Sequence, residues 1–405
     1  MRGGRWPRMA ALALLYLAVF AGQSWVTRQV FTSQVPGAND FYPRWAGGCA
    51  LLWEGASPYD GATTLRIQQG MYGRPAQPTE DQAAYAYPLH TLWLTWPTCL
   101  SRDFATVQAA WMTLLIHAAL AGTALAKIAA GWQPTKAAWM ATLVWSVFVY
   151  PNLRAILLGQ LSLLVFLCLM ASLVLIVRGR LGWAGIMLAL ATVKPQMSFL
   201  IVGWLLWWSW QSGRGRLLRS FGLTLLALLG GVTLLQPDWI AGFLDQLVRY
   251  PSYTELGSAI WIMTSYYLAT PPLLAWGLTA LALAALGSVW WRFRSASEAW
   301  MLWVAGLTLL ATHFVAPRTA TTHFAVYLLP LFLLFESWRR AGNPQSIVWL
   351  TLAAVFFGSW VLFLVTVSGN QESAINYLPI PLLLLAAIVW RPSRLVLSST
   401  VAAGQ

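Results

Sequence analysis

The chain contains 405 residues, of which 59% are hydrophobic and only 9% are charged. Soluble domains carry about 25% charged residues, so this composition excludes an ordinary soluble protein and indicates lipid as the solvent. The formal net charge of +13 would suggest nucleic acid in a soluble protein. In a membrane protein the distribution of the charges along the chain is more informative than their sum, and we expect no nucleic-acid partner.

Apolar segments of membrane-spanning length recur along the whole chain. They predict an all-α integral membrane protein with a single polytopic membrane domain, residues 1–405, and 12 spans within a range of 11–13. The predicted spans are 9–30, 104–127, 136–152, 159–177, 181–194, 196–212, 217–236, 268–291, 298–316, 320–336, 346–367 and 375–390. Several are shorter than the roughly 20 residues that a crossing helix needs, so we expect some helices to kink or end within the membrane.

The basic residues predict the orientation, because cytoplasmic loops carry an excess of Lys and Arg. With the N-terminus in the cytoplasm, 16 of the 25 basic residues fall at inner span ends, accompanied only by Glu298 and Glu336. The outer segments hold the other 9 bases and 10 acids. We therefore expect cytoplasmic N- and C-termini in a bacterial plasma membrane. The two long loops, residues 31–103 and 237–267, are then extracytoplasmic.

The first long outer loop carries helix and turn signals. From Phe41 to Trp53 the pattern is that of an amphipathic helix, which prefers the membrane interface. The turn at residues 57–60 leads into a second short helix. Residues 85–100 are too short and too interrupted by proline for a span, so we expect a re-entrant or interfacial hairpin there.

The cysteines Cys49, Cys99 and Cys168 lack the C-x-x-C spacing of a metal or redox site. Cys49 and Cys99 share the first outer loop, so a disulfide between them is possible. We nevertheless expect isolated thiols.

Asp40 is the first candidate for chemistry, because an ionisable group at a membrane is costly and needs a reason. A carboxylate there can act as a general base toward an attacking hydroxyl, a role worth roughly 10²–10⁴-fold in rate. The alternative is a helix N-cap, because Asp40 directly precedes the first predicted interfacial helix. Spacing alone favours the cap.

Outer cations form the second group of candidates. Lys194 ends a short span before Pro195, so its ammonium can snorkel outward or neutralise a phosphate at the interface. Arg318 and His323 lie at an outer helix boundary, where free backbone N–H groups favour an anion. A lone histidine there is more often a satisfied interface residue, and Arg44 alone is more simply a headgroup contact or local ion pair.

The remaining motifs are weaker or missing. Gly159-Gln160 can orient a polar substrate, although tight helix packing explains the glycine equally well. The sequence has no P-loop, HExxH, GxSxG or DxD arrangement, and the acids near Asp40 form no close pair. We therefore expect no cofactor and no required metal.

An ordered set of short fragments extends over residues 39–336. The fragments are Asn39-Asp40-Phe41 with Tyr42 and Trp45, Gly55-Ala56-Ser57-Pro58-Tyr59-Asp60, Tyr87-Pro88-Leu89, Gly159-Gln160, Lys194-Pro195-Gln196, and His323 before Tyr327 and Pro330. In this order they resemble the GT-C superfamily of integral-membrane glycosyltransferases. The resemblance is greatest to glycosyltransferase family 87, the polyprenyl-phosphate-mannose-dependent mannosyltransferases. The chain departs from the family pattern at Leu89, Ser162 and Thr321-Thr322, which affects the expected donor and acceptor more than the fold.

The resemblance implies a GT-C fold whose first outer loop forms interfacial helices over a cavity. It implies a donor sugar, mannose, on a polyprenyl phosphate, an acceptor hydroxyl on a glycolipid or glycan, and membrane lipids as further partners. Asp40 is then the general base of an inverting displacement through an oxocarbenium-like state. The residues implied to bind the donor phosphate are Lys194, His323, Arg318 and Arg44. Those implied to contact substrate are Tyr42, Trp45, Tyr59, Asp60, Tyr87, Gln160 and Gln196.

A solute transporter or lipid flippase without glycosyl transfer is the main alternative. Transporters usually bind substrate near the bilayer midplane, on broken helices of repeated halves. Here the polar groups gather at one outer mouth, and we find no internal repeat. A non-catalytic scaffold is the third reading. It predicts that Asp40, Lys194 and His323 tolerate replacement equally well.

Overall fold

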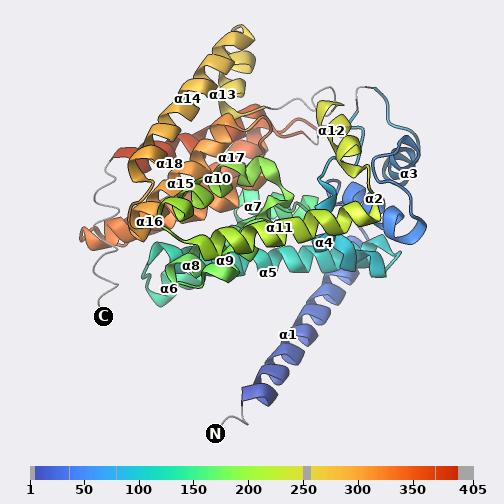
Figure 1. Cartoon of the computed structure of the whole chain (residues 1–405), viewed down its shortest axis with the longest axis horizontal. Helices are drawn as coiled ribbons and strands as arrows, with labels where there is room; N and C mark the ends of the chain where they lie inside the picture. The colour runs from blue at the N-terminus through green and yellow to red at the C-terminus, as the bar shows by residue number, and fades with distance from the viewer. Residues whose placement is uncertain (1–4, 36, 79, 250–256, 370, 391–405) are drawn as a thin grey trace. The chain divides into compact units, whose positions relative to one another are not determined.

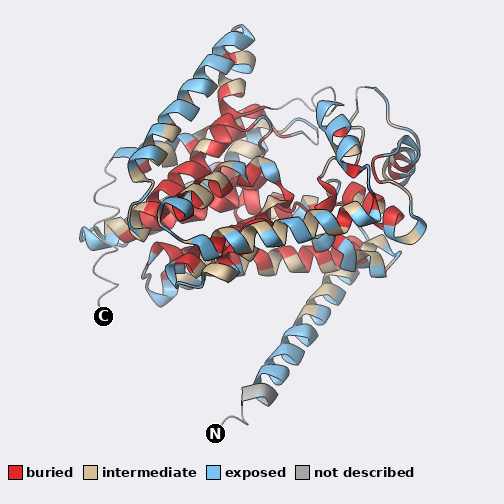
Figure 2. Cartoon of the chain, in the orientation of Figure 1, coloured by how far each residue is buried: buried red, intermediate tan, exposed pale blue. Residues whose placement is uncertain are grey.

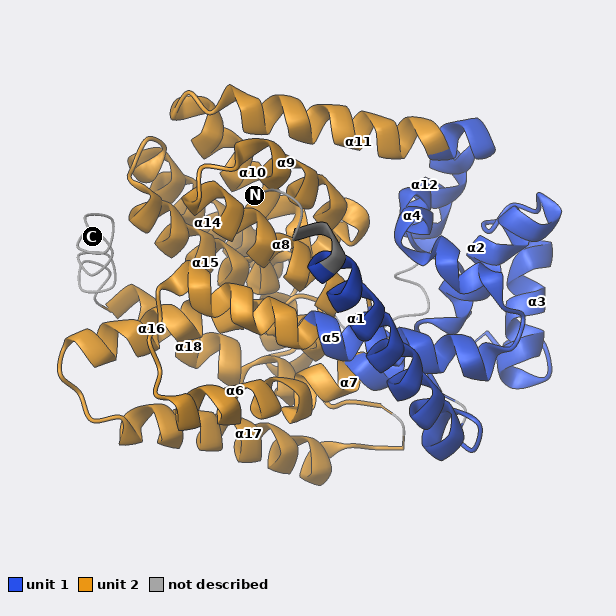
Figure 3. Cartoon of the chain, turned by 90° about the horizontal axis from the view of Figure 1, so that it is seen from below, with its two compact units in different colours: residues 1–118, 156–160, 232–253 blue, residues 119–155, 161–231, 254–405 orange. Residues whose placement is uncertain are grey.

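The computed structural model describes residues 5–35, 37–78, 80–249, 257–369 and 371–390. In these ranges the chain forms α-helices joined by short 3₁₀ and π turns, and it has no strand (Figure 1). It divides into two compact units (Figure 3). The first unit comprises residues 1–118, 156–160 and 232–253, and the second comprises 119–155, 161–231 and 254–405.

Six helical stretches in the described ranges are long and apolar enough to cross a membrane. The first is Arg8–Thr32, which comprises most of α1 (Arg5–Thr27) and the π turn that follows it. The other five are α5 (Phe104–Ala130), α11 (Gly215–Leu235), α14 (Pro272–Phe293), α15 (Glu298–Val315) and α17 (Ser346–Thr366). The pair α6 (Lys136–Phe148) and α7 (Tyr150–Leu158), bent by 47°, gives a seventh when it is counted as one span. The chain is therefore a helical integral membrane protein.

Each of the twelve predicted spans contains a helix, but outside the bent α6–α7 pair five of these helices have 17 residues or fewer. They are α8 (Ser162–Val177), α9 (Leu181–Leu190), α10 (Pro195–Gln211), α16 (Leu328–Arg340) and α18 (Pro379–Trp390). Each is shorter than the roughly 20 residues of a typical crossing helix. The count of twelve spans and the GT-C fold therefore stay predictions.

The second unit contains both buried and exposed helices (Figure 2). α8 and α15 are buried along most of their lengths, whereas α14 and α17 expose apolar side chains such as Trp276 and Phe357. Lipid solvates such side chains as well as a protein core does, so exposed apolar helices are expected in a membrane protein. Indole N–H groups make hydrogen bonds in the interior. Trp204 of α10 donates to the carbonyl of Met301, and Trp208 of α10 donates to the carbonyl of Ala296.

The first unit contains the long loop of residues 31–103 that was predicted to be extracytoplasmic. The amphipathic pattern after Asp40 becomes α2 (Tyr42–Glu54), and the turn after it leads into α3 (Gly61–Tyr72), both close to the predicted positions. Residues 89–100 form only short turns around α4 (Leu92–Thr95), which are too short to cross a bilayer. A further helix, α12 (Trp239–Arg249), comes from the second long outer loop.

A disulfide joins Cys49 of α2 to Cys99, so the expectation of isolated thiols was wrong. The two cysteines are 50 residues apart in sequence, and spacing of that length gives no signal of contact. The indole N–H groups of Trp45 and Trp53 reinforce the same junction by donating to the carbonyls of Thr98 and Cys99. A cross-link over a loop of this length is worth about 4 kcal/mol in the chain-entropy account.

Candidate functional site

Asp40 lies in a turn held in a costly backbone conformation. Ala38, two residues earlier, has φ 58° and is buried, and its N–H donates to the carbonyl of Leu157 at 3.2 Å. Left-handed backbone at a residue with a side chain costs energy and persists only where the surroundings enforce it, often at functional sites. The N-cap of α2 is Phe41, and the Asp40 carboxylate is instead engaged by a side chain from a distant segment.

That side chain is Gln160, whose Nε2 donates to the Asp40 carboxylate across 120 residues of sequence. Gly159 makes the approach possible. Its φ is 71°, and a Cβ added there would lie 2.5 Å from Cβ of Phe41. Close approach, rather than helix packing, therefore explains the glycine. The turn brings together two of the sequence fragments, Asn39-Asp40-Phe41 and Gly159-Gln160.

Arg44 secures the same turn from inside α2. Its side chain is 1% exposed, its Nη2 donates to the Gly159 carbonyl at 2.6 Å, and its guanidinium lies 4.6 Å from the ring centre of Tyr87. Nε and Nη1 are buried with no hydrogen-bond partner among the described residues. Buried donors in native proteins are nearly always paired, so these two N–H groups point to a ligand that accepts hydrogen bonds.

A second carboxylate, Asp81, lies within electrostatic reach of Asp40 and was not singled out from the sequence. Burial raises the pKa of Asp81, the hydrogen bond from the N–H of Ala83 lowers it, and the negative charge of Asp40 raises it further. The residue is nevertheless open to solvent. Ala83 has φ 47°, so both acids lie two residues from a strained alanine.

The predicted aromatic contacts serve mainly to build this unit. Trp45 is buried and hydrogen-bonded to Thr98, and half-buried Tyr42 fits against Gly70 of α3. The Tyr59 hydroxyl donates to the carbonyl of Tyr87 at 2.6 Å, and burial raises the Tyr59 pKa. Asp60 is exposed and stands at the N-cap position of α3.

The second unit holds the other predicted residues. Lys194 is 1% exposed and lies at the break between a 3₁₀ turn and α10, where Pro195 starts the new helix. His323 is buried in the 3₁₀ segment Thr321–Tyr327 and lies within electrostatic reach of Lys194. These two residues are thus brought together from positions far apart in sequence. Gln196 and Arg318 are half-buried.

A buried acid that sequence reasoning missed anchors the segment that carries His323. The Glu372 carboxylate accepts hydrogen bonds from the hydroxyls of Tyr150 at 2.8 Å and Thr321 at 2.9 Å, and it pairs with Arg154 at 3.5 Å. Burial raises the Glu372 pKa, and the charge of Arg154 opposes that shift. Glu372 and Arg154 were both expected on the outer side of the membrane, but nothing in the sequence shows that they pair.

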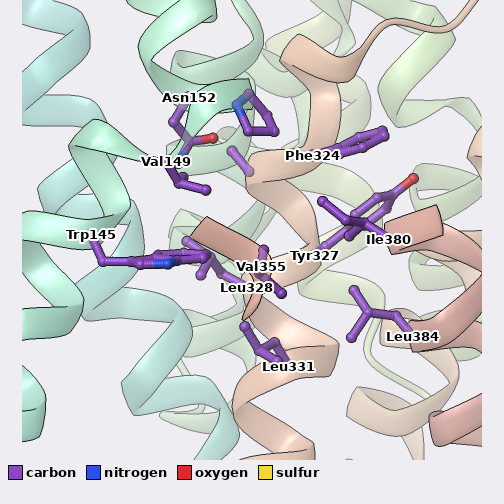
Figure 4. Close-up of a pocket in the computed structure, with 12 residues that line it drawn as sticks. Trp145, Val149, Asn152, Phe324, Tyr327, Leu328, Leu331, Val355, Ile380 and Leu384 are labelled. Atoms are coloured by element: carbon purple, nitrogen blue, oxygen red, sulfur yellow. The ribbon is translucent and has the colours of Figure 1, made fainter. Parts of the chain in front are cut away.

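Figure 4 shows a crevice next to this segment, lined by Trp145, Phe324, Tyr327, Leu331 and other mainly apolar side chains. Its volume of about 40 Å³ is far below the 300–1,000 Å³ of typical ligand sites, so it does not hold a sugar. Among the described residues, no group of three His, Cys, Asp or Glu side chains is placed to hold a metal ion.

The protein-family model described as glycosyltransferase family 87 matches residues 85–317 of the chain. No curated protein and no solved structure matches the chain. The matched stretch contains Tyr87, Gln160 and Lys194, whereas Asp40 and His323 lie outside it.

Proposed function

This chain belongs to glycosyltransferase family 87, and from that membership we propose that it transfers mannose from a polyprenyl phosphate to a hydroxyl of a lipid-linked or polymeric glycan. Family membership supports glycosyl transfer itself. The choice of a lipid-phosphate donor follows from the membrane-spanning helices, because a donor carried by a lipid reaches an enzyme embedded in the same bilayer.

Asp40 is the general base in this proposal. Its carboxylate takes the proton of the acceptor hydroxyl as that oxygen attacks the anomeric carbon. The bond from the anomeric carbon to the phosphate oxygen breaks on the opposite face, and the polyprenyl phosphate leaves with the electron pair. One displacement through an oxocarbenium-like state inverts the anomeric configuration. Gln160 orients the base by its hydrogen bond.

Cations stabilise the departing phosphate. We assign this role to Arg44, whose buried Nε and Nη1 lack partners among the described residues, and to Lys194, His323 and Arg318 of the second unit. Preorganised donors aimed at developing charge are usually the largest single contribution to catalysis. Tyr42, Trp45, Tyr59, Tyr87 and the half-buried Gln196 are assigned to shaping the substrate site.

The reaction takes place on the extracytoplasmic face of a bacterial plasma membrane, with both termini in the cytoplasm. Two independent features support this orientation. The basic residues alternate between loops as the positive-inside rule requires. The disulfide Cys49–Cys99 belongs to the same loop as Asp40, and disulfides persist in oxidising compartments outside the cytoplasm.

The observation that carries the proposal is the Asp40–Gln160 hydrogen bond, which joins a carboxylate in a strained turn to the family-matched stretch. The test is an assay of membranes containing the chain with polyprenyl-phosphate mannose, arabinofuranose and glucose. We expect transfer from the mannose donor, and an inverted product by NMR. Transfer from no lipid-phosphate donor, together with solute uptake into vesicles, would favour the transporter.

A further inference from the structure

A cavity of about 560 Å³ lies within the first unit, between α3, residues 75–78 and 82–84, and α12. Figure 3 shows these elements in the blue unit. We refer to it as the α3–α12 groove. Its volume falls within the 300–1,000 Å³ range of small-molecule sites.

The groove is fixed before any ligand arrives. Gln68 of α3 holds its loop wall, because its Nε2 donates to the Gln82 carbonyl at 2.9 Å and its Oε1 accepts from the N–H of Ala76 at 2.9 Å. On the other wall, Gly242 of α12 packs directly on Tyr59, where a Cβ would lie 2.9 Å from the tyrosine Cβ. Preorganised walls of this kind reduce the cost of binding.

The lining chemistry selects a neutral, hydroxyl-rich ligand. The groove is lined by the amide residues Gln82 and Gln246, by Thr64 and by the ring of Tyr59, beside apolar faces such as Pro75. The Gln82 amide and the Tyr59 hydroxyl already donate to backbone carbonyls, so we assign the polar contacts with a ligand to Thr64 and Gln246. The charged lining residue Arg249 pairs with Asp245 at 2.9 Å, so the wall carries little net charge. Side-chain amides match sugar hydroxyls as both donors and acceptors, and proline or tyrosine faces match the C–H faces of sugar rings.

Two connections link residues of the groove wall with the surroundings of Asp40. Tyr59 donates to the Tyr87 carbonyl, and the Tyr87 ring lies against Arg44. Gln82 directly follows Asp81, which lies within electrostatic reach of Asp40. The groove wall and the proposed base thus belong to the same compact unit and share contacts through Tyr87.

The outer surface of α12 indicates where the groove opens. Ile240, Leu244, Leu247 and Val248 are all exposed on this helix, whereas Trp239, Gln246 and Gly242 face inward. An exposed apolar face of this kind suits a helix to the membrane interface. The groove then opens beside lipid headgroups, where the glycan of a membrane-anchored acceptor would lie.

We propose that the α3–α12 groove binds the neutral sugar residues of the acceptor glycan, beyond the hydroxyl that receives the new sugar. This inference rests on the proposed function for the identity of the ligand, but its binding test does not depend on catalysis.

The test uses the full chain in nanodiscs, with Thr64→Trp to fill the groove and Ala62→Trp as the matched control on the exposed surface of α3. Saturation-transfer NMR with mannotriose and maltotriose as neutral probes, and inorganic phosphate as a charged probe, reports binding. We expect trisaccharide binding to weaken at least tenfold in Thr64→Trp and to persist in Ala62→Trp. Gln246→Ala, which removes an amide without adding bulk, should weaken it to a lesser extent.

Two outcomes would overturn the proposal: trisaccharide binding unchanged in both groove variants, or phosphate binding in place of sugar. The acceptor KM separates this inference from the proposed function. If the wild type transfers sugar and Thr64→Trp keeps the same acceptor KM, the groove assignment is wrong while the function stands. If trisaccharides bind in the groove but no donor supports transfer, the proposed function is wrong while the sugar site stands.

Discussion

Each compact unit holds an acid and an arginine in one neighbourhood, but the two neighbourhoods differ. In the second unit, Glu372 is satisfied by Tyr150, Thr321 and Arg154. In the first unit, Asp40 follows a strained Ala38, and the nearby Arg44 keeps two buried nitrogens without a partner among the described residues.

The difference separates a structural acid from a candidate catalytic one. A saturated network fixes the position of its segments and leaves no group for a substrate. Strained backbone and unpartnered donors both cost free energy in the free protein. A substrate that accepts hydrogen bonds from those donors removes the cost of leaving them unpaired. On this basis we propose a catalytic role for Asp40 and a structural role for Glu372, which positions the segment that carries His323.

Replacing the proposed base should have the largest effect on rate. Asp40→Asn keeps the size of the side chain but removes its basicity, so we expect transfer to fall by roughly 10²–10⁴-fold with folding retained. Initial rates in membrane vesicles measure this effect. Asp238→Asn, an exposed acid of the same unit, is the control and should transfer at the wild-type rate.

Removing the group that orients the base should have a smaller effect. Gln160→Leu deletes a hydrogen bond to a charged group, which is worth about 1.5–3 kcal/mol, so we expect kcat to fall by about 10- to 100-fold. The exposed Gln34→Leu serves as the control. An unchanged kcat in Gln160→Leu would show that the hydrogen bond plays no part in the reaction.

Glu372 should show its effect in stability. Glu372→Gln removes the charge that Arg154 pairs with inside the protein, and we expect a loss of about 2–3 kcal/mol. Glu298→Gln breaks the more exposed pair with Arg214 and should cost less than about 1 kcal/mol. Thermal unfolding in detergent compares the two variants, and equal losses would remove the distinction between them.

The smallest effect should appear in the pH dependence at Asp81. Its pKa is raised in the folded protein, so its stabilising contribution is present at low pH and is lost as the pH rises through the folded pKa. Asp81→Asn should therefore stabilise the protein at pH 7 by about 1 kcal/mol or less, because the side chain is exposed, and the gain should vanish toward pH 4. Unfolding temperatures at both pH values test this sign, and a gain confined to pH 4 would reverse it.

Hydropathy predicted where helices form, because lipid-facing and buried spans need the same apolar segments. It did not predict the bend at Val149, where extended backbone with ψ 136° separates α6 from α7. It also missed α12, although the spacing of Ile240, Leu244 and Leu247 is an amphipathic helical signal that was available in the sequence.

The candidate site was only partly predictable. Asp40 and Gln160 were singled out from the residues, and the family resemblance raised Asp40 from an N-cap to a general base, but the hydrogen bond between them depends on folding across 120 residues. The same holds for the Cys49–Cys99 disulfide and for the acids Asp81 and Glu372. Local spacing carries no information about such distant contacts.

The central claim is tested most directly by the rate of mannose transfer per folded molecule, measured for Asp40→Asn and Glu372→Gln in parallel preparations. The account predicts less than about 1% of the wild-type rate for Asp40→Asn, and a rate within about threefold of wild type for the folded fraction of Glu372→Gln, because a rate change of that size corresponds to less than 1 kcal/mol. Full transfer by folded Asp40→Asn would contradict it.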